Sequence, residues 1–459
     1  MAKGKYLNQN SKQPRSGGIW IVIALLLIAI VALFIICLRG YLPFTGESTG
    51  HTSGTTAAQT TEQTTVSTTE TTAPTEPYVV STASIGVTGD VLMHSPVMNA
   101  ARKSDGTYDF SDNYVFMQDY FNSFDFMIAN LEVTLGGTEA GEYRGYPTFN
   151  CPDDVVDGLL VSGVDMLLTA NNHTYDTGHN GFIRTQQVLD EKGMLHLGTR
   201  QSEEVKNYMV QDLNGIKVGM LCYTYETGDT SDGRKCLNGI PVSKDDTNLV
   251  NSFSYNDLEG FYSEVTTALA SMDQEGADAS IVFIHWGDEY QLSPNTHQTT
   301  IAQGLCDLGV DVIVGGHPHV IQPFETLTSE TGHNTYCIYS VGNAMSNQRR
   351  DTLSTGNARY TEDGMVFGVS FEKWNDGSVN ISEISILPTW VNKEWRNNKQ
   401  NYNMIPLDTA VPVWDCYEVG NISNTYSSYE RTMSIVGEGL NACRTAFGLE
   451  EMPLTFGAE

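Results

Sequence analysis

The sequence predicts an α/β fold in which helices cover the faces of β-sheets, and two observations support this. Six short apolar runs are unbroken rather than alternating, which is typical of strands buried on both faces. These runs are residues 83–90, 124–132, 164–173, 279–287, 310–319 and 336–343. Between them lie segments with helical spacing, such as 177–193 and 297–309, each of which ends at a glycine. Strands that alternate with helices indicate sheets with helices packed on them.

The N-terminal region is expected to be a membrane anchor behind a short basic tail. Ile19–Leu38 is a run of 20 uncharged residues, long enough as a helix to span one hydrocarbon core. A cleaved signal peptide, the alternative, has a shorter apolar region and small residues at its cleavage site. Four basic residues precede the run and only Arg39 follows closely, so the positive-inside rule places residues 1–17 in the cytoplasm. We therefore expect a single-pass protein of the cell membrane, with its anchor at 18–38 and an extracellular C-terminal domain.

The next segment, residues 39–78, is expected to be a disordered stalk. It is rich in Thr, Ser and Gly, and such a composition buries too little apolar surface to fold. No acidic residue precedes Glu47, so the exported part after Arg39 carries all 55 acidic residues against 20 basic ones. This charge argues against binding to nucleic acid or to an anionic membrane surface. It would also repel an anionic polymer unless cations intervene.

Residues 79–392 are expected to form the main domain, and 393–459 a C-terminal extension that packs on its core. The segments 364–374 and 379–390 have the pattern of a strand pair, and 427–448 has the pattern of one helix. The 8 cysteines include no C-x-x-C pair, which excludes a zinc ribbon and argues against a disulfide framework. The chain also lacks the G-x-x-x-x-G-K-[ST] and G-x-S-x-G motifs, so a P-loop NTPase and a simple serine hydrolase are disfavoured.

The apolar runs end in polar side chains that are suited to binding metal. Ligands of α/β folds bind beyond the carboxyl ends of the strands, so we expect these side chains to meet. They are Asp90, His94, Glu132, Asn171, Asn172, His173, His285, His317 and His319. Mixed imidazole and oxygen donors accept several divalent metals, and one shared carboxylate can hold two ions about 3.5–4 Å apart. The sequence therefore predicts a site for two divalent ions, with Mn, Zn, Fe and Mg all possible.

The segment "GGHPHV" places His317 and His319 on either side of Pro318. The proline removes an N–H group and fixes the local backbone angle, and the two preceding glycines are expected to permit a tight turn off the strand. Imidazoles at positions i and i+2 can then point to two different metals. An isolated H-x-H pair is commonly a loop without metal, but the other clusters favour the metal interpretation.

Six motifs follow one another between Ser84 and Asn347: "GDVLMH", "ANLEVTL", "ANNHTYDTG", "FIHWGDEY", "GGHPHVIQPFE" and "YSVGNAM". In order and spacing they resemble the CapA family, the bacterial capsule-synthesis or poly-γ-glutamate biosynthesis proteins. The resemblance implies a layered α-β-β-α sandwich like that of calcineurin-like metallophosphoesterases. It also implies a role in synthesis, export or surface attachment of an anionic capsular polymer such as poly-γ-glutamate. The polymer or its precursor and other capsule-synthesis membrane proteins would be the partners.

The resemblance also implies a set of metal ligands. These are Asp90, Glu132, Asn172, His285, His317 and His319. Glu132 would take the place of the bridging carboxylate, and Asp90 and His319 would belong to the first metal. Metallophosphoesterases begin with an Asp-x-His pair, whereas this chain has no histidine two residues after Asp90. The first metal would therefore lose one ligand.

Two residues would take part in catalysis rather than bind metal. His173 would donate a proton to a leaving oxygen or steady a phosphoryl oxygen. Asp176 either orients His173 or caps the following helix. Tyr290 either faces substrate or packs. The candidates for the substrate pocket are His94, Asn171, Glu289, Tyr290 and Asn343.

Two further functions remain compatible with these residues. One is a metal-dependent phosphoesterase or related hydrolase at the cell surface. The other is a catalytically inactive module that binds the polymer.

Overall fold

The computed structural model describes residues 76–396, 398–411 and 422–456. Pro74–Glu459 forms one compact unit, and the fold described below is that of this unit. The expected basic tail, the anchor and all but the end of the stalk lie outside the described residues. In the part of the chain that the structure describes, no helix is both long enough and apolar enough to cross a membrane.

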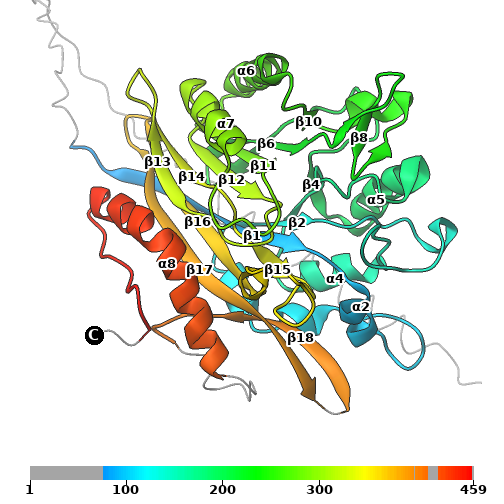
Figure 1. The fold of residues 1–459 in the computed structure, drawn as a ribbon. Coiled ribbons are helices and arrows are strands. Elements are labelled where there is room, and N and C mark those ends of the chain that lie inside the picture. The colour runs from blue at the N-terminus through cyan, green and yellow to red at the C-terminus, as the bar shows by residue number, and fades with distance from the viewer. Residues whose placement is uncertain (1–75, 397, 412–421, 457–459) are drawn as a thin grey trace, which may run out of the picture. The chain divides into compact units, whose positions relative to one another are not determined.

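One mixed sheet of eight strands carries the first part of the site (Figure 1). Its strands are β1 (Val79–Val91), β2 (Phe126–Leu131), β3 (Met166–Leu168), β4 (Leu195–Leu197), β15 (Asn343–Met345), β16 (Asp363–Trp374), β17 (Val379–Arg396) and β18 (Lys399–Pro406). They follow the order β18-β17-β16-β1-β2-β3-β4, and β15 pairs with β1. β1 is parallel to β2 and β15 and antiparallel to β16. The end of β1 therefore lies beside the ends of two parallel neighbours.

A second mixed sheet of seven strands carries the rest of the site. Its strands are β5 (Met209–Leu213), β6 (Ile216–Tyr225), β10 (Ser252–Phe253), β11 (Ala279–His285), β12 (Val312–Gly316), β13 (Phe324–Thr328) and β14 (Asn334–Ile338). The order is β10-β6-β11-β12-β14-β13, with β5 beside β6. A small antiparallel sheet contains β7 (Gly228–Asp229), β8 (Lys235–Leu237) and β9 (Ile240–Pro241).

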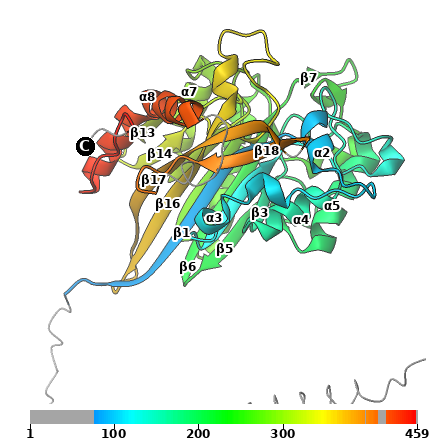
Figure 2. The same ribbon diagram turned by 90° about the horizontal axis from the view of Figure 1, so that it is seen from below.

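Helices cover both large sheets (Figures 1 and 2). The helices of the described residues are α2 (Ser95–Ala101), α3 (Gln118–Phe121), α4 (Asp154–Val161), α5 (Gly178–Lys192), α6 (Leu258–Gln274), α7 (Thr296–Asp307) and α8 (Ile422–Ala446). Short 3-10 turns lie at Ser111–Tyr114, Thr138–Ala140, Lys244–Leu249 and Ala358–Glu362.

Three apolar clusters define the layers. Ile85 and Ile128 of the first sheet share a core with Met220 and Phe283 of the second, so the sheets face one another. On the other face of the first sheet, side chains of β2 and β3 pack with those of α2, α4 and α5. On the other face of the second sheet, side chains of β6, β11 and β12 pack with those of α6 and α7. Each fully buried aliphatic side chain stabilises the fold by about 1.5–3 kcal/mol. Packing between the layers therefore fixes the positions of the strand ends.

The structure confirms the mixed α/β class and several individual elements. The helices expected at 177–193 and 297–309 are α5 and α7, and the glycine after each adopts a positive φ (Gly193, 72°; Gly309, 86°). The expected C-terminal strand pair is β16 and β17, and the last helix is α8. The sequence analysis did not predict β6 or α6, although "IKVGMLCYTY" in β6 is an apolar run. β17 continues through position 392, where the main domain was expected to end.

α8 is fixed to the first sheet by a buried ion pair. The Arg431 guanidinium donates to both carboxylate oxygens of Asp363, at 2.7 and 2.6 Å, and the Ser428 hydroxyl donates to one of them at 2.6 Å. Burial raises the pKa of Asp363 to about 6, although Arg431 opposes this rise. Asp363 begins β16 and is directly followed by Gly364, which forms a bridge with Gly342 next to the end of β1.

Replacing Arg431 by Met is expected to lower the free energy of unfolding by about 3–5 kcal/mol at pH 8, because Asp363 is left buried without its cation. A carboxyl group whose folded pKa is raised contributes stability below its unfolded pKa and loses it as pH rises through the folded pKa. The deficit of Arg431→Met should therefore be smaller at pH 5 than at pH 8. Urea unfolding at the two pH values measures it. Lys192→Met is the control, since it removes a partly exposed pair with Asp157 worth no more than about 1 kcal/mol; equal losses in the two variants would contradict the prediction.

Candidate metal centre

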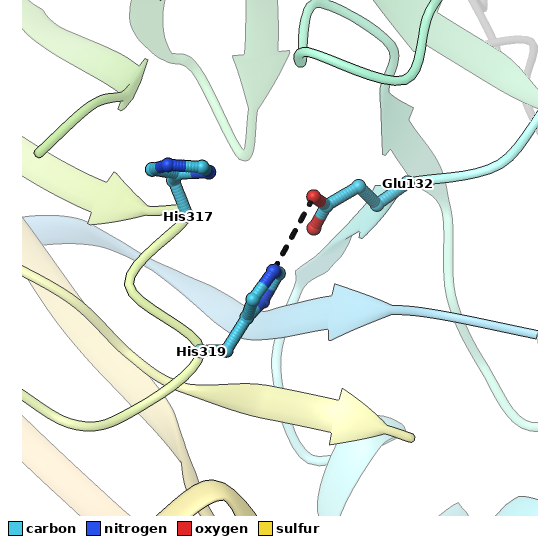
Figure 3. A group of neighbouring side chains, drawn as sticks. All are labelled: Glu132, His317 and His319. Atoms are coloured by element: carbon cyan, nitrogen blue, oxygen red, sulfur yellow. Dashed lines mark ion pairs between the residues drawn. The ribbon is translucent and has the colours of Figure 1, made fainter. Parts of the chain in front are cut away.

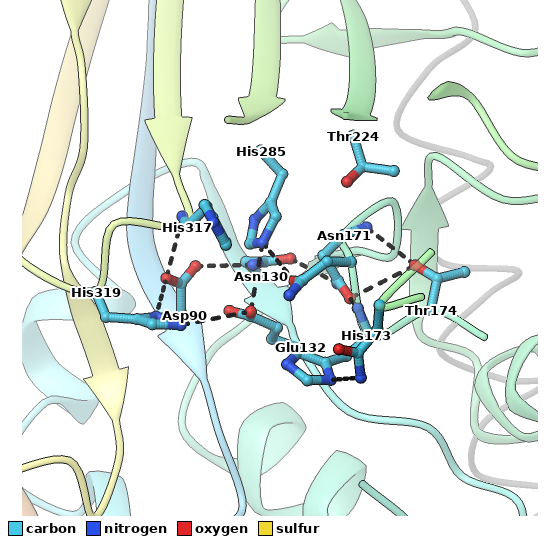
Figure 4. Close-up of polar contacts among 12 residues, drawn as sticks. Asp90, Asn130, Glu132, Asn171, His173, Thr174, Thr224, His285, His317 and His319 are labelled. Carbon is cyan, nitrogen blue, oxygen red and sulfur yellow. Dashed lines mark hydrogen bonds and ion pairs between the residues drawn. The ribbon is translucent and has the colours of Figure 1, made fainter. Parts of the chain in front are cut away.

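The site lies where the strands of both sheets end, and each expected metal ligand comes from one of these ends (Figure 4). Asp90 is the last residue but one of β1, and Glu132 directly follows β2. Asn172 lies in the loop after β3, and His285 is the last residue of β11. His317 and His319 follow β12, and all six side chains are buried. The close approach behind Asp90 requires a glycine, because a Cβ on Gly89 would lie 1.8 Å from the carbonyl oxygen of Gly342.

The loop after β12 is strained at both histidines. His317 has φ 96° and His319 has φ 56°, which are unusual values for side-chain-bearing residues, each costing about 1–3 kcal/mol. The expectation that the preceding glycines make this turn is wrong, since both belong to β12. Gly315 is needed for a different reason: a Cβ there would lie 2.0 Å from the carbonyl oxygen of Tyr339. The surrounding structure supports the strained backbone at these two histidines. One support is the Asn343 amide, which donates to the His319 carbonyl at 3.2 Å.

The Glu132 carboxylate faces the His319 ring, with His317 nearby (Figure 3). One of its carboxylate oxygens is 3.3 Å from His285 Nε2 and 3.8 Å from His319 Nε2. The side chain is fully buried, yet among the described residues neither oxygen has a hydrogen-bond partner. A buried carboxylate without hydrogen bonds is costly unless a cation compensates its charge. The environment of Glu132 therefore fits a ligand of a positive ion.

Asp90 and His319 form one arm of the site. His319 Nδ1 is 3.1 Å from one carboxylate oxygen of Asp90, and the Asn130 amide donates to the other at 2.8 Å. Burial alone would raise the pKa of Asp90, but the hydrogen bond and charge of His319 outweigh it and lower that pKa. Burial likewise opposes the charge on His319, but Glu132 and Asp90 outweigh it and raise the pKa of His319 to about 9. The carboxylates of Glu132 and Asp90 therefore favour the positively charged form of His319.

His285, Asn172 and His317 form the other arm. His285 Nε2 lies 2.9 Å from the Asn172 amide oxygen. Burial, followed by the charges of His285 and His319, holds the pKa of His317 well below its ordinary value. His317 Nε2 lies 3.2 Å from the Tyr225 hydroxyl, whereas Nδ1 is buried without a partner. A neutral imidazole with a free nitrogen fits the role of a metal ligand.

The donors form two groups of three, each compact enough to hold an ion. One group is Glu132, His317 and His319, and the other is Asp90, Glu132 and His285; in each, the candidate ligand atoms lie within 4.8 Å of one another. Glu132 belongs to both groups, as expected for a shared carboxylate. These buried groups can hold metal ions, and the set of imidazole and carboxylate donors accepts several divalent metals.

A histidine–carboxylate pair lies beside this cluster. His173 Nδ1 is 2.7 Å from an Asp176 carboxylate oxygen, which also accepts a hydrogen bond from the Phe149 backbone N–H at 2.6 Å. The other oxygen of Asp176 accepts from the Asn238 amide at 2.9 Å. The helix-capping interpretation of Asp176 is wrong, because Thr177 occupies the N-cap position of α5. Asp176 instead contacts the His173 ring at Nδ1, so Nε2 is the ring nitrogen without this partner. A catalytic role for the pair stays a prediction.

A family model described as "Bacterial capsule synthesis protein PGA_cap" matches residues 84–348. The chain belongs to this family. Capsule biosynthesis protein CapA of Bacillus anthracis is 25% identical over 268 residues, which are 57% of this chain and 59% of that protein. PGA biosynthesis protein CapA of Bacillus subtilis (strain 168) is 30% identical over 188 residues, 40% of this chain and 43% of that protein. All the predicted site residues lie inside the region matched by the capsule-synthesis family.

The residues predicted to line a substrate pocket differ from one another in their surroundings. His94 is held by the Asn347 backbone N–H at 3.3 Å, and burial lowers its pKa to about 4. Its ring contacts that of Phe149, which contacts His173. Tyr290 is half-buried with its ring 6.2 Å from His319, and Glu289 is exposed. Whether these side chains contact substrate stays a prediction.

Asn171 and Asn343 lie behind the cluster. The Asn171 amide donates to the Leu131 carbonyl at 2.9 Å and to Asn130 at 3.1 Å. The Asn343 amide donates to the carbonyls of His319 and Thr361. Both side chains are fully buried, so their contacts support the backbone around the site. Contact of either with substrate stays a prediction.

The sequence analysis missed several residues that shape the site. Asn130 links Asp90 to Asn171, and its only signal was its place near the end of β2, two residues before Glu132. Tyr225 was missed along with β6, the strand that it ends. Asn238 comes from the turn between β8 and β9, where nothing in the sequence indicated a contact with Asp176.

The absence of an Asp-x-His pair is also visible in the fold. Leu92 occupies the position of that histidine, is 1% exposed and belongs to the apolar cluster under α2 and α4. The arm formed by Asp90 and His319 is thus closed on this side by apolar packing. The first ion would be held by fewer protein ligands than the second.

Proposed function

We propose that the protein acts outside the cell membrane in the synthesis, export or surface attachment of an anionic capsular polymer such as poly-γ-glutamate. We further propose that its domain is a metallophosphoesterase-like sandwich whose strand-end cluster binds two divalent ions. Membership of the capsule-synthesis family supports the first part, as does the likeness to the PGA biosynthesis protein CapA of Bacillus subtilis. The polymer or its precursor and other membrane proteins of capsule synthesis are the proposed partners.

The observation that carries the metal centre is Glu132, a fully buried carboxylate whose two oxygens lack hydrogen bonds. Within the described residues, neither Glu132 nor Asp90 forms an ion pair with a lysine or arginine. The compensating charge must therefore come from histidines or from bound cations. By the family resemblance, Asp90, Glu132 and His319 would hold the first ion, and Glu132, Asn172, His285 and His317 the second. The two compact groups divide the donors differently, since one combines Glu132 with His317 and His319 and the other combines it with Asp90 and His285.

Bound ions would give an acidic protein a place to hold an acidic polymer. The net charge of the whole chain is −30, which repels a polyanion at long range. Divalent ions at the strand ends supply Lewis-acid activation and electrostatic stabilisation of bound oxyanions. The chain's own residues then orient those ions, and Leu92 with its apolar neighbours keeps water from one side of the cluster.

Metal content tests the proposal directly. Residues 74–459, purified without chelator or nickel resin, are expected to carry one to two ions per chain by mass spectrometry. The His317→Ala, His319→Ala double variant should lose them. Poly-γ-glutamate should bind the loaded protein and be released by EDTA. Absence of metal after soaking in Mn²⁺ or Zn²⁺, or binding of polymer that EDTA leaves unchanged, would overturn the metal centre.

The second candidate is a metal-dependent hydrolase, and the His173–Asp176 pair favours it. The 2.7 Å contact presents a histidine in a fixed orientation beside the cluster, as a general acid requires. A binding module has no need of such a pair. Turnover of a chromogenic phosphodiester in Mn²⁺ separates the two functions, and the variant for that assay is discussed below.

A further inference from the structure

A polar cleft of about 570 Å³ is lined by segments that also lead to the metal centre. It is lined by residues from the loops after β4 and β6, from β8 and from β10, and from α6. Two segments connect it to the site already described. Glu226 lines the cleft and directly follows Tyr225, whose hydroxyl contacts His317. Lys235 lines the cleft three residues before Asn238, whose amide contacts Asp176.

The cleft contains charges of both signs, and Lys235 and Glu226 form a long ion pair within it. Lys235 Nζ is 4.0 Å from the nearest Glu226 oxygen, although their side chains are only 11% and 16% exposed. The Ser252 hydroxyl lies between them, accepting from Lys235 at 2.6 Å and donating to Glu226 at 2.8 Å. The Lys235 ammonium also donates to the Val250 carbonyl, so one of its three N–H groups is left for a ligand.

Two more charged residues of the cleft, Arg200 and Glu264, are held by neutral groups, and Glu203 and Asp229 add two further carboxylates to its lining. Arg200 donates to the Asn251 side chain at 2.6 Å and to a backbone carbonyl, and within the described residues no carboxylate lies at ion-pair distance from it. Glu264 accepts only from the Tyr223 hydroxyl at 3.0 Å and the Asn207 amide at 3.2 Å. Arg200 is nevertheless close enough to Lys235 to lower the pKa of that ammonium, after the larger effect of burial.

This arrangement matches a zwitterion. A carboxylate would be attracted by the neighbouring cations Arg200 and Lys235, and an ammonium by the carboxylates Glu226 and Glu264. Neutral partners hold these four groups in place, and with Glu203 and Asp229 the carboxylates of the cleft outnumber its two cations, which favours a ligand with a free ammonium. A metal ion is a poorer fit, because the cleft contributes no group of three metal-ligating side chains among the described residues.

We propose that this cleft binds an α-amino acid end that carries both a free ammonium and a carboxylate. Resting on the proposed function, the ligand is the amino end of a γ-linked glutamate chain. There alone the chain presents an α-ammonium beside an α-carboxylate, since every other nitrogen of the polymer is an amide. The cleft therefore recognises the end of the chain, whereas the metal centre recognises carboxylates along it.

Calorimetric titration of metal-loaded residues 74–459 with a γ-linked glutamate pentamer tests the inference. The pentamer with a free amino end should bind at least about 10-fold more tightly than its N-acetylated form, because acetylation removes the ammonium. Lys235→Met and Glu226→Gln should each weaken binding about 10-fold or more. The control Lys192→Met, on α5, should leave binding unchanged.

The outcomes separate this inference from the metal centre. Equal binding of the free and acetylated pentamers would overturn it, as would unchanged binding by Glu226→Gln, a variant that keeps the shape of the side chain. The metal content of each variant should equal that of the wild type. If the protein carries no metal but still distinguishes the two pentamers, the metal centre fails and the cleft stands; if metal is bound without this discrimination, the cleft fails alone.

Discussion

Glu132→Gln is expected to abolish metal binding and at the same time to make the metal-free protein more stable than metal-free wild type. The amide removes the one donor shared by both groups of ligands, so the metal content should fall from one to two ions per chain to none. Without metal, wild-type Glu132 is a buried charge whose oxygens lack hydrogen bonds. Removing that charge relieves a desolvation cost of about 1–3 kcal/mol. Melting temperatures with EDTA and with Mn²⁺, together with mass spectrometry, measure both effects.

Glu362→Gln is the matched control for this experiment. Glu362 is also fully buried, but its oxygens accept from Arg350 at 2.9 and 2.8 Å and from the Trp390 indole at 3.2 Å. Loss of its charge should destabilise the protein with or without metal, because two arginines lose their partner. If Glu132→Gln behaved like Glu362→Gln, losing stability in EDTA, the carboxylate would be part of the apo core and not a ligand.

The strand ends were predictable because their signal is local. Unbroken apolar runs that end in Asp90, Glu132, His285 or His319 locate both the strand and the polar residue that leaves it. Parallel pairing then brings such ends to one edge, whatever the details of packing. The class of fold and the membership of the cluster therefore follow from the sequence and its family resemblance.

Contacts between distant segments could not be predicted in this way. The Asn238 amide reaches Asp176 across 62 positions of sequence, from a turn of a small sheet that has no periodic pattern. The backbone of the β12 loop is another case, since the sequence suggested that glycines turn it and the structure shows histidines with positive φ. Such strain depends on the support of Asn343, which is recognisable only in three dimensions.

His173→Ala is expected to lower turnover of a chromogenic phosphodiester in Mn²⁺ by about 10²–10⁴-fold if the protein is a hydrolase. As the imidazolium, His173 donates its Nδ1–H to Asp176 and delivers its Nε2 proton to a leaving oxygen, which leaves a neutral ring, and alanine supplies no proton. His173 belongs to neither group of metal-ligating side chains, so the metal content should stay that of wild type. Asp176→Asn should lose less, about 10–100-fold, because the imidazole remains but is no longer held in one tautomer.

His196→Ala is the control for this assay. That imidazole lies on β4 beside Asp190, away from the cluster, and its loss should leave turnover unchanged. Equal rates for wild type and His173→Ala, with metal bound in both, would exclude His173 as the acid and favour a module that binds polymer without cleaving it. A rate that falls together with the metal content would instead show that His173 supports the ligands. Measuring both quantities on the same samples therefore distinguishes chemistry from assembly of the site.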